Sequence, residues 1–370
     1  MKQQQFSVVT DGDAARAALE AALPAGWDDL GEETVMLGDA LGRVLVADVS
    51  STVDVPGFDR ANLDGWAVRA ADTHGATEAA PVRLRRHPEA VAIGRPTNEA
   101  LGPEQAMRIP TGGALPRGAD AVLRVEDTEV DGDEVMFWRA QVPGGGITYA
   151  GTDLCAGETL YRRGKSLTSR EIGVLAACGH AEVRVRRQPR VAVLSTGDEL
   201  VAPGTAIAPA ELFDANGPML EAAVAEHGAR PVPLGILPDD PAALVDGLRR
   251  ALALADVVLF SGGTSKGPGD LNVTVLREHL AVPVVVVHGE ALEPGKPLCL
   301  AAHGRQPVVV LPGYPTSAIF TFHEFVVPLL RRMAGLEAAM RRSVSARMPR
   351  RLRSEPGRTE YECEDGRGRQ

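Results

Sequence analysis

The sequence has few cysteines and lacks long apolar runs. Its four cysteines, Cys155, Cys178, Cys299 and Cys363, form no C-x-x-C pair and have no histidine at ligand spacing. Neither a zinc site nor a disulfide framework is therefore expected. No uninterrupted apolar stretch approaches the roughly 20 residues that span a bilayer, and the polar start MKQQQFS does not look like a signal peptide. These absences favour a cytoplasmic protein without a membrane span.

Lysine is also scarce, and acidic residues outnumber basic ones. The formal net charge is −10 and the pI is near 5.4, which argues against a general surface for nucleic acid or anionic membranes. Only four residues are lysine, and two of them, Lys266 and Lys296, lie in glycine-rich turns. Because arginine does not replace the compact lysine ammonium, this placement indicates that such a group is needed there.

One segment, residues 255–270 (ADVVLFSGGTSKGPGD), changes abruptly from strand to loop. Val257 to Phe260 show no polar alternation, which favours a strand that is buried on both faces of a parallel sheet. The loop offers backbone N–H groups and hydroxyls that suit an anion such as phosphate. Its candidate binding residues are Ser261, Gly262, Gly263, Thr264, Ser265 and Lys266, with Asp270 at the following helix start. The spacing is not that of a Walker A motif, and a tight connection capped by Asp270 is the alternative.

Helical patterns occur early in the chain and again near residue 168. The pattern of residues 12–23 predicts one helix, and a short second helix is expected after Gly38-Asp39. Thr168 and Glu171 form a capping box ahead of a third helix, with Gly179 at its C-terminal end.

Between these helices the pattern is typical of a β domain. Short apolar runs are broken at close intervals by glycine and proline, and Asp131-Gly132 suits a hairpin turn. We therefore predict a discontinuous helical domain of residues 1–53 and 148–187, into which a β domain of residues 54–147 is inserted.

After the β stretch, strands and helices alternate. Apolar strands at residues 191–194, 232–237 and 308–311 with intervening helices predict an α/β domain built on a doubly wound parallel sheet. This domain is assigned residues 188–335. Residues 336–370 are too few for a domain, and their arginine- and glycine-rich end favours a solvated tail over an arm that binds nucleic acid.

Polar residues follow the ends of these strands, where doubly wound sheets bind their ligands. They comprise Glu199, Asp239, Asp240, the loop 261–270, Lys296 and the turn from Pro312 to Ser317. Carboxylates beside a phosphate loop predict Mg²⁺ held between protein and phosphate oxygens. Asp239 and Asp240 remain alternatives, because either one could instead only cap the next helix.

Eight motifs in order resemble those of the molybdopterin molybdenumtransferases, the family that includes the E domain of gephyrin. They are VPGFDRANLDGWAVRAAD (55–72), RIPTGGALPRGADAV (108–122), LSTGDEL (194–200), DANGPML (214–220), GILPDDP (235–241), SGGTSKGPGD (261–270), PGKP (294–297) and LPGYPTSA (311–318). The resemblance runs from about residue 10 to residue 335. It implies the three domains above, a molybdopterin-binding role for the α/β domain, a further C-terminal β domain and a homodimer. Only GRTEY (357–361) is similar to the start of that last domain, so a shortened member is expected.

The family resemblance also implies a reaction: molybdate enters adenylylated molybdopterin with Mg²⁺, and AMP and molybdenum cofactor are released. Catalytic roles are implied for Asp64 and Thr111 of the inserted domain, which in the family dimer faces the partner's α/β crevice. They are also implied for Asp153 in a GTD turn and for Lys296. The implied metal ligands are Glu199, Asp239 or Asp240, and Asp270; the implied molybdate and cofactor turns contain Lys296, Pro297, Pro312, Pro315 and Ser317.

Departures from the family pattern keep two other functions open. ITYA (147–150) replaces an arginine-rich run, Glu293 stands where relatives often have lysine, and Tyr314 replaces a common asparagine. A non-catalytic scaffold would bind the pterin without molybdate-dependent AMP release. A molybdopterin adenylyltransferase shares the α/β fold but does not need the inserted domain. The resemblance also implies two kinds of protein partner: the molybdopterin adenylyltransferase and the molybdoenzymes that accept the cofactor.

Overall fold

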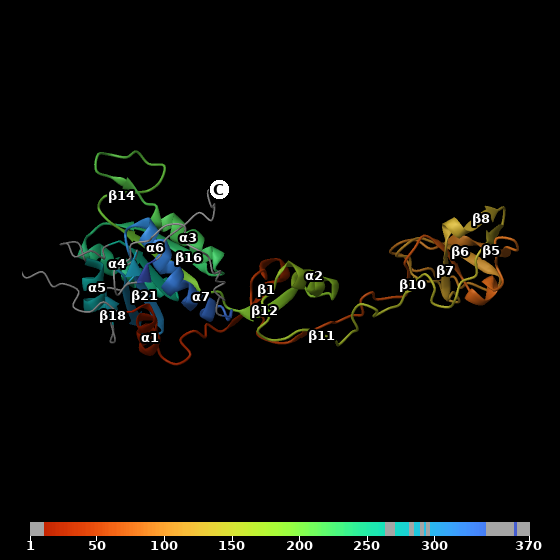
Figure 1. Ribbon diagram of the computed structural model, residues 1–370, viewed down its shortest axis with the longest axis horizontal. Coiled ribbons are helices and arrows are strands. Elements are labelled where there is room, and N and C mark those ends of the chain that lie inside the picture. The colour runs from red at the N-terminus through yellow and green to blue at the C-terminus, as the bar shows by residue number, and fades with distance from the viewer. Residues whose placement is uncertain are drawn as a thin grey trace, which may run out of the picture. The chain divides into compact units, whose positions relative to one another are not determined.

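The computed structural model of the chain describes residues 11–262, 271–280, 285–288, 292–293, 297–337 and 359–360 (Figure 1). Contacts divide the chain into two compact units. Unit 1 comprises Met1–Thr34, Gly42–Val46 and Arg184–Gln370, and unit 2 comprises Val35–Leu41 and Ala47–Val183. Within the described residues, no helix is long and apolar enough to cross a membrane.

Unit 1 is a mixed α/β structure. Its helices are α1 (Gly12–Ala22), α3 (Asn216–Glu226), α4 (Pro241–Leu254), α5 (Leu271–His279), α6 (Pro315–Thr321), the π-helical η4 (Phe322–Val326) and α7 (Val327–Met333). Its strands are β13 (Arg190–Thr196), β14 (Leu200–Val201), β15 (Leu212–Phe213), β16 (Arg230–Leu237), β17 (Val257–Ser261), β18 (Val285–His288), β19 (Leu292–Glu293), β20 (Cys299–His303), β21 (Gln306–Leu311) and β22 (Thr359–Glu360). Strands β1 (Glu32–Met36) and β12 (Glu182–Arg186) each include residues of both units.

Six of these strands form one sheet in the order β16-β13-β17-β21-β20-β18. The first four are parallel, as the alternating pattern predicts, but β20 runs antiparallel to both of its neighbours. The sheet is therefore mixed and not wholly parallel. The sequence reading missed β20, which joins β21 through the two residues Gly304 and Arg305. Gly304 has a φ of +57°, the left-handed conformation that such a short hairpin turn requires.

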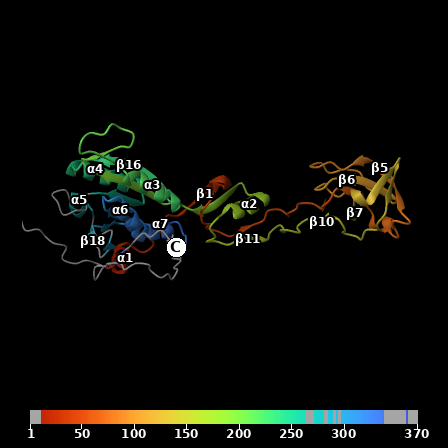
Figure 2. The same ribbon diagram turned by 45° about the horizontal axis from the view of Figure 1, so that its top comes forward.

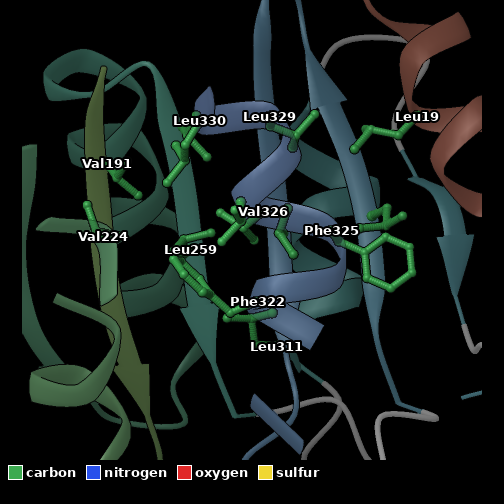
Figure 3. Packing of buried hydrophobic residues seen from close by; sticks show 14 of the residues in the cluster. Leu19, Val191, Val224, Leu259, Leu311, Phe322, Phe325, Val326, Leu329 and Leu330 are labelled. Atoms are coloured by element: carbon green, nitrogen blue, oxygen red, sulfur yellow. The ribbon is translucent and has the colours of Figure 1, made fainter. Parts of the chain in front are cut away.

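The central strands are buried on both faces, as predicted for residues 257–260. Alternate residues enter two separate cores: Leu259 and its neighbours pack under α3, η4 and α7, whereas Phe260 faces α4 and α5. Figure 3 shows the first core, in which Phe322, Val326 and Leu330 lie over Leu259 and Leu311. Burying a large apolar side chain contributes about 1.5–3 kcal/mol, so these two cores hold the strands in place.

The long helix predicted after residue 314 contains a π-helical turn. Helices α6 and α7 are joined without a break by η4, which spans Phe322–Val326. Pro328 lies in the first turn of α7 and cannot donate a backbone hydrogen bond to the Glu324 carbonyl, which accounts for the wider turn at this position.

The opening helix packs in the core of unit 1. Leu19, Leu23 and Trp27 belong to the same buried cluster as Leu259, and Figure 3 shows Leu19 of α1 beside this core. The contact division therefore groups α1 with the α/β sheet, whereas the sequence reading grouped residues 1–53 with residues 148–187. The physical reason is that an amphipathic helix needs an apolar surface to cover, which the sheet provides.

Unit 2 is built mainly from short strands (Figure 2). They are β2 (Val49–Ser50), β3 (Arg60–Ala61), β4 (Gly65–Val68), β5 (Val82–Ala90), β6 (Gln105–Ile109), β7 (Ala121–Arg124), β8 (Thr128–Asp131), β9 (Glu134–Phe137), β10 (Ile147–Thr148) and β11 (Thr159–Tyr161). Its helices are α2 (Ser169–Ala177) and the 3-10 turns η1 (Leu37–Asp39), η2 (Ala70–Thr73) and η3 (Val125–Asp127).

Six of the strands form a sheet in the order β7-β4-β6-β5-β9-β8, which agrees with the β character predicted for this stretch. Gly132 has a φ of +62° and turns β8 into β9, as Asp131-Gly132 predicts. The predicted capping box of Thr168 and Glu171 is present at the start of α2. The domain boundaries at 53/54, 147/148 and 187/188 stay predictions.

The predicted short helix after Gly38-Asp39 was wrong. The helical turn η1 ends at Asp39, and Leu41 is 65% exposed, so no continuous apolar face forms. Val44 and Leu45 are buried, but Leu45 forms a β-bridge with Val185 instead of a helical turn.

The sheet of unit 2 has no room for a side chain at Gly65. A Cβ atom there would lie 1.8 Å from the Leu123 carbonyl oxygen on the neighbouring strand β7. Gly65→Ala is therefore expected to lower the free energy of unfolding of unit 2 by about 3 kcal/mol. Gly38→Ala is the matched control, because no atom lies within 4 Å of a Cβ at that position. Denaturant unfolding of the full chain would measure both, and equal stability of the two variants would contradict the packing described.

Candidate active site

The carboxyl ends of three parallel strands lie side by side in unit 1. In the strand registers, Ser195 of β13 pairs with Ser261 of β17, and Ser261 pairs with Leu311 of β21. The turns that follow these strands therefore begin at one edge of the sheet. This edge is where a doubly wound sheet binds its ligands.

Buried polar side chains are concentrated at this edge. Eleven polar or charged residues of the described chain are buried, and six of them either end β13 or β17 or lie at the starts of α3 and α5, beside these ends. They are Ser195, Thr196, Asp214, Asn216, Ser261 and Asn272, each at most 7% exposed. Burying a polar group costs free energy unless it is hydrogen-bonded, so a concentration of this kind marks a candidate site.

The sequence analysis assigned only Ser261 of these six to the site. Four of the others lie within the quoted motifs LSTGDEL and DANGPML, which could have drawn attention to them. Three acceptor atoms, Ser195 Oγ, Asn216 Oδ1 and Asn272 Oδ1, have no hydrogen-bond partner in the part of the chain that the structure describes. These atoms could accept hydrogen bonds from a ligand or from water.

Two glycines at this edge lie where the chain leaves no room for a side chain. Gly262 has a φ of +104°, and a Cβ atom there would lie 2.5 Å from the Thr196 carbonyl oxygen. A Cβ at Gly217 would lie 2.5 Å from Asp214 Oδ2. Gly262 therefore has a backbone conformation that favours glycine.

Carboxylates gather in the turns after β13 and β16. The Asp239 N–H donates to Asp198 Oδ1 at 3.0 Å. Partial burial raises the pKa of the Asp239 carboxyl, and the negative charges of Asp198 and Glu199 raise this pKa further. A raised pKa in a cleft of like charges is a common feature of functional sites.

Asp240 has a structural role in this turn. Its carboxylate accepts a hydrogen bond from the Ala243 N–H at 2.9 Å and caps α4, which is the alternative role considered for it above. Glu199 is exposed. Among the described residues, no group of three or more metal-ligating side chains is present. Asp270, the remaining predicted ligand, lies outside the described residues, so the magnesium set stays a prediction.

Several predicted binding residues also lie outside the described part of the chain: Gly263, Thr264, Ser265, Lys266 and Lys296. The others follow β21 or precede β20. Pro312 is buried and Pro315 begins α6, where the half-buried Ser317 accepts a hydrogen bond from Thr321 Oγ1 through its backbone carbonyl. Pro297 is half-buried and lies two residues before β20. Their proposed contacts with ligand are untested.

Unit 2 brings together two residues that are 47 positions apart, Asp64 and Thr111. The strands β4 and β6 are antiparallel neighbours with Gly65 opposite Ile109, so the residues flanking this pair meet. Asp64 Oδ1 accepts from the Thr111 N–H at 2.8 Å and from Thr111 Oγ1 at 3.1 Å.

These hydrogen bonds favour the charged form of the Asp64 carboxylate. They lower its pKa, and the positive charge of Arg108 lowers it further. Both Asp64 and Thr111 are exposed. Asp153 is exposed as well, and its N–H donates to the Val55 carbonyl at 3.0 Å; no described hydrogen bond joins it to the Asp64–Thr111 pair.

Comparison with known proteins identifies the family. Residues 11–179 match the MoeA N-terminal region (domain I and II), and residues 192–332 match a probable molybdopterin binding domain. The chain is 36% identical over 307 residues to a molybdopterin molybdenumtransferase of Nostoc sp., covering 82% of this chain and 70% of that protein. It is 37% identical over 335 residues to molybdopterin molybdenumtransferase 2 of Mycobacterium tuberculosis, covering 89% and 82%.

The solved structures agree. A crystal structure of the molybdopterin biosynthesis moea protein from Pyrococcus horikosii is 38% identical, covers 90% of this chain and 81% of that one, and superposes with a TM-score of 0.72. The chain belongs to the molybdopterin molybdenumtransferase family.

The raised pKa of Asp239 generates a stability prediction. A carboxyl whose pKa is higher in the folded state than in the unfolded state costs stability when ionised, and this cost disappears as the pH falls below the unfolded value of 3.8. Asp239→Asn is therefore expected to raise the free energy of unfolding at pH 7, by less than about 1 kcal/mol because solvent screens the half-buried carboxylate. Wild type and variant should converge near pH 3.

The neighbouring residue supplies the control for this experiment. Asp240→Asn keeps an equally good helix cap and should change the melting temperature little at either pH. Thermal unfolding of the full chain at pH 7 and pH 3 gives the comparison. A lower stability of Asp239→Asn at pH 7 would contradict the crowding of carboxylates described.

Proposed function

We propose that this chain is a transferase of molybdenum cofactor biosynthesis that inserts molybdate into adenylylated molybdopterin and releases AMP. The observation that carries the proposal is the carboxyl edge of the unit 1 sheet, where six buried polar residues surround glycine-containing turns. Such an edge can hold a polyanionic substrate through backbone N–H groups and hydroxyls. Membership of the molybdopterin molybdenumtransferase family supports this assignment.

The reaction needs charge neutralisation and positioning more than a nucleophilic side chain. A phosphoanhydride is cleaved while molybdate meets the dithiolene sulfurs, so several negative groups must be held close together. The hydroxyl of Ser261 and the N–H groups of the loop that follows would hold the phosphate of the cofactor. Lys296 and Ser317 would bind the molybdate oxyanion.

Carboxylate oxygens are the ligands that Mg²⁺ prefers, and the turns after β13 and β16 offer them. Burial raises the pKa of Asp239, and the negative charges of Asp198 and Glu199 raise it further; a divalent cation would neutralise these charges. Glu199 and Asp239, with Asp270, would hold this ion. It would supply positive charge to the phosphate oxygens.

Asp64 and Thr111 complete the proposed site. The charged Asp64 carboxylate and the Thr111 hydroxyl are exposed on unit 2 and joined by two hydrogen bonds, so they form a preorganised polar pair. We propose that the chain is a cytoplasmic homodimer in which this pair and the carboxyl edge of unit 1 come from different protomers.

The experiment that tests the function measures AMP release from adenylylated molybdopterin with Mg²⁺, with and without molybdate. Molybdate-dependent release, together with reconstitution of a cofactor-free molybdoenzyme, is the expected result. Binding of the pterin without either outcome would favour the scaffold function, and formation of adenylylated molybdopterin from ATP would favour the adenylyltransferase.

A mixing experiment tests the shared site. Asp64→Asn and Ser261→Ala are each expected to lower molybdate-dependent AMP release at least about 100-fold, because each removes a group that positions substrate. If each site uses Asp64 of one protomer and Ser261 of the other, mixed dimers contain one intact site. Equal mixing after dissociation should then restore about a quarter of the wild-type activity, since half of the dimers are mixed.

The same mixture distinguishes the other arrangements. No recovery in mixed dimers would mean that both groups act within one protomer or in separate sites. Mixing Asp64→Asn with Thr111→Val is the control, because these changes lie in one hydrogen-bonded pair and cannot complement each other. Sedimentation must show that mixed dimers have formed.

A further inference from the structure

We propose that Asn216 and Asn272 are positioning residues that fix the spacing of the three turns at the carboxyl edge of the unit 1 sheet. Each side-chain amide donates two hydrogen bonds and so joins the ends of two neighbouring strands. We call these two side chains the amide clamps. Their effect on turnover rests on the proposed function, whereas their effect on the turns does not.

The first amide clamp joins β17 to the turn after β21. Asn216 is the first residue of α3 and is 7% exposed. Its Nδ2 donates to Ser261 Oγ at 2.7 Å and to the Gly313 carbonyl at 2.7 Å. Ser261 ends β17, and Gly313 lies in the turn that contains Pro312 and Pro315.

The second amide clamp joins β13 to the turn after β17. Asn272 is the second residue of α5 and is 3% exposed. Its Nδ2 donates to Thr196 Oγ1 at 2.9 Å and to the Gly262 carbonyl at 2.8 Å. Helices α3 and α5 pack in different cores on opposite faces of the sheet, so the three strand ends are held from both sides.

The chemistry of the clamps determines the orientation of both amides. Each Nδ2 faces a backbone carbonyl, which can only accept, so a flipped amide would place oxygen against oxygen. The turns also lie in contact: a Cβ at Gly313 would be 3.7 Å from the Gly262 Cα. Because a hydrogen bond lost in a buried site leaves its partner unsatisfied, removing one clamp would displace both turns that it joins.

A displaced turn would affect binding and turnover together. The groups proposed to hold substrate lie on these turns, and a misplacement of about 1 Å can cost about 100-fold in rate. Asn216→Ala and Asn272→Ala are each expected to lower kcat/KM by about 10- to 100-fold, with a higher KM as well as a lower kcat. A residue that only stabilised the fold would lower the amount of active protein and leave KM unchanged.

Gln306 provides a matched control in the same sheet. Its Nε2 also donates two hydrogen bonds, to the carbonyls of Leu252 at 2.8 Å and Ala255 at 2.6 Å. It is the first residue of β21, at the opposite end of this strand from Gly313. Gln306→Ala should therefore lower the melting temperature about as much as either clamp variant, and its KM should stay that of wild type.

A second pair of variants keeps the test valid if an asparagine variant does not fold. Thr196→Val retains the shape of the side chain but removes the acceptor of Asn272, whereas Thr196→Ser keeps a hydroxyl. Thr196→Val should raise KM more than Thr196→Ser does. Equal KM values for these two variants, or a wild-type KM in the folded clamp variants, would overturn the proposal.

Amide hydrogen exchange separates this proposal from the proposed function. The Gly262 N–H donates to the Leu311 carbonyl at 3.1 Å and reports on the turn after β17. Asn272→Ala should speed its exchange at least about tenfold, while Gln306→Ala should not. If these exchange rates are found but the wild-type chain lacks molybdate-dependent AMP release, the amide clamps are retained and the proposed function is rejected. Unchanged exchange in Asn272→Ala would reject the clamp whatever the activity.

Discussion

The burial of three parallel strands on both faces is the constraint on which the candidate site depends. Residues of β13, β17 and β21 alternate between two apolar cores, so the strands cannot shift in register without exposing one of these cores. Their carboxyl ends are consequently fixed at one edge. Polar residues at the ends of the strands, such as Thr196 and Ser261, are then buried because the apolar residues that precede them in the chain are buried. The two cores thus create the polar edge.

A similar logic governs unit 2 on a smaller scale. The antiparallel register of β4 and β6 brings Asp64 and Thr111 together, and Gly65 lets β7 approach β4 closely. The two hydrogen bonds from Thr111 favour the charged form of Asp64 and lower its pKa. Both groups of polar residues therefore depend on the register of a sheet.

Sequence reasoning found the strands whose pattern is unambiguous. Residues 257–260 are apolar without alternation, and they form a strand buried on both faces. It missed β20, because the run Cys-Leu-Ala-Ala-His carries no period and its turn to β21 has only two residues. It also missed Asn216 and Asn272 as site residues. A polar residue in the first turn of a helix is common, and only the packing of that helix decides whether its side chain is buried.

We propose that unit 1 binds the molybdate substrate at the carboxyl edge of its sheet. The most direct measurement is a crystal structure of the full chain with AMP and molybdate, in which anomalous scattering locates molybdenum. We expect a single strong peak beside the turns that contain Gly262 and Gly313, and we expect a Lys296→Ala crystal to lose that peak. A molybdenum site on another face of the chain, with this edge unaltered, would rule out molybdate binding at the carboxyl edge.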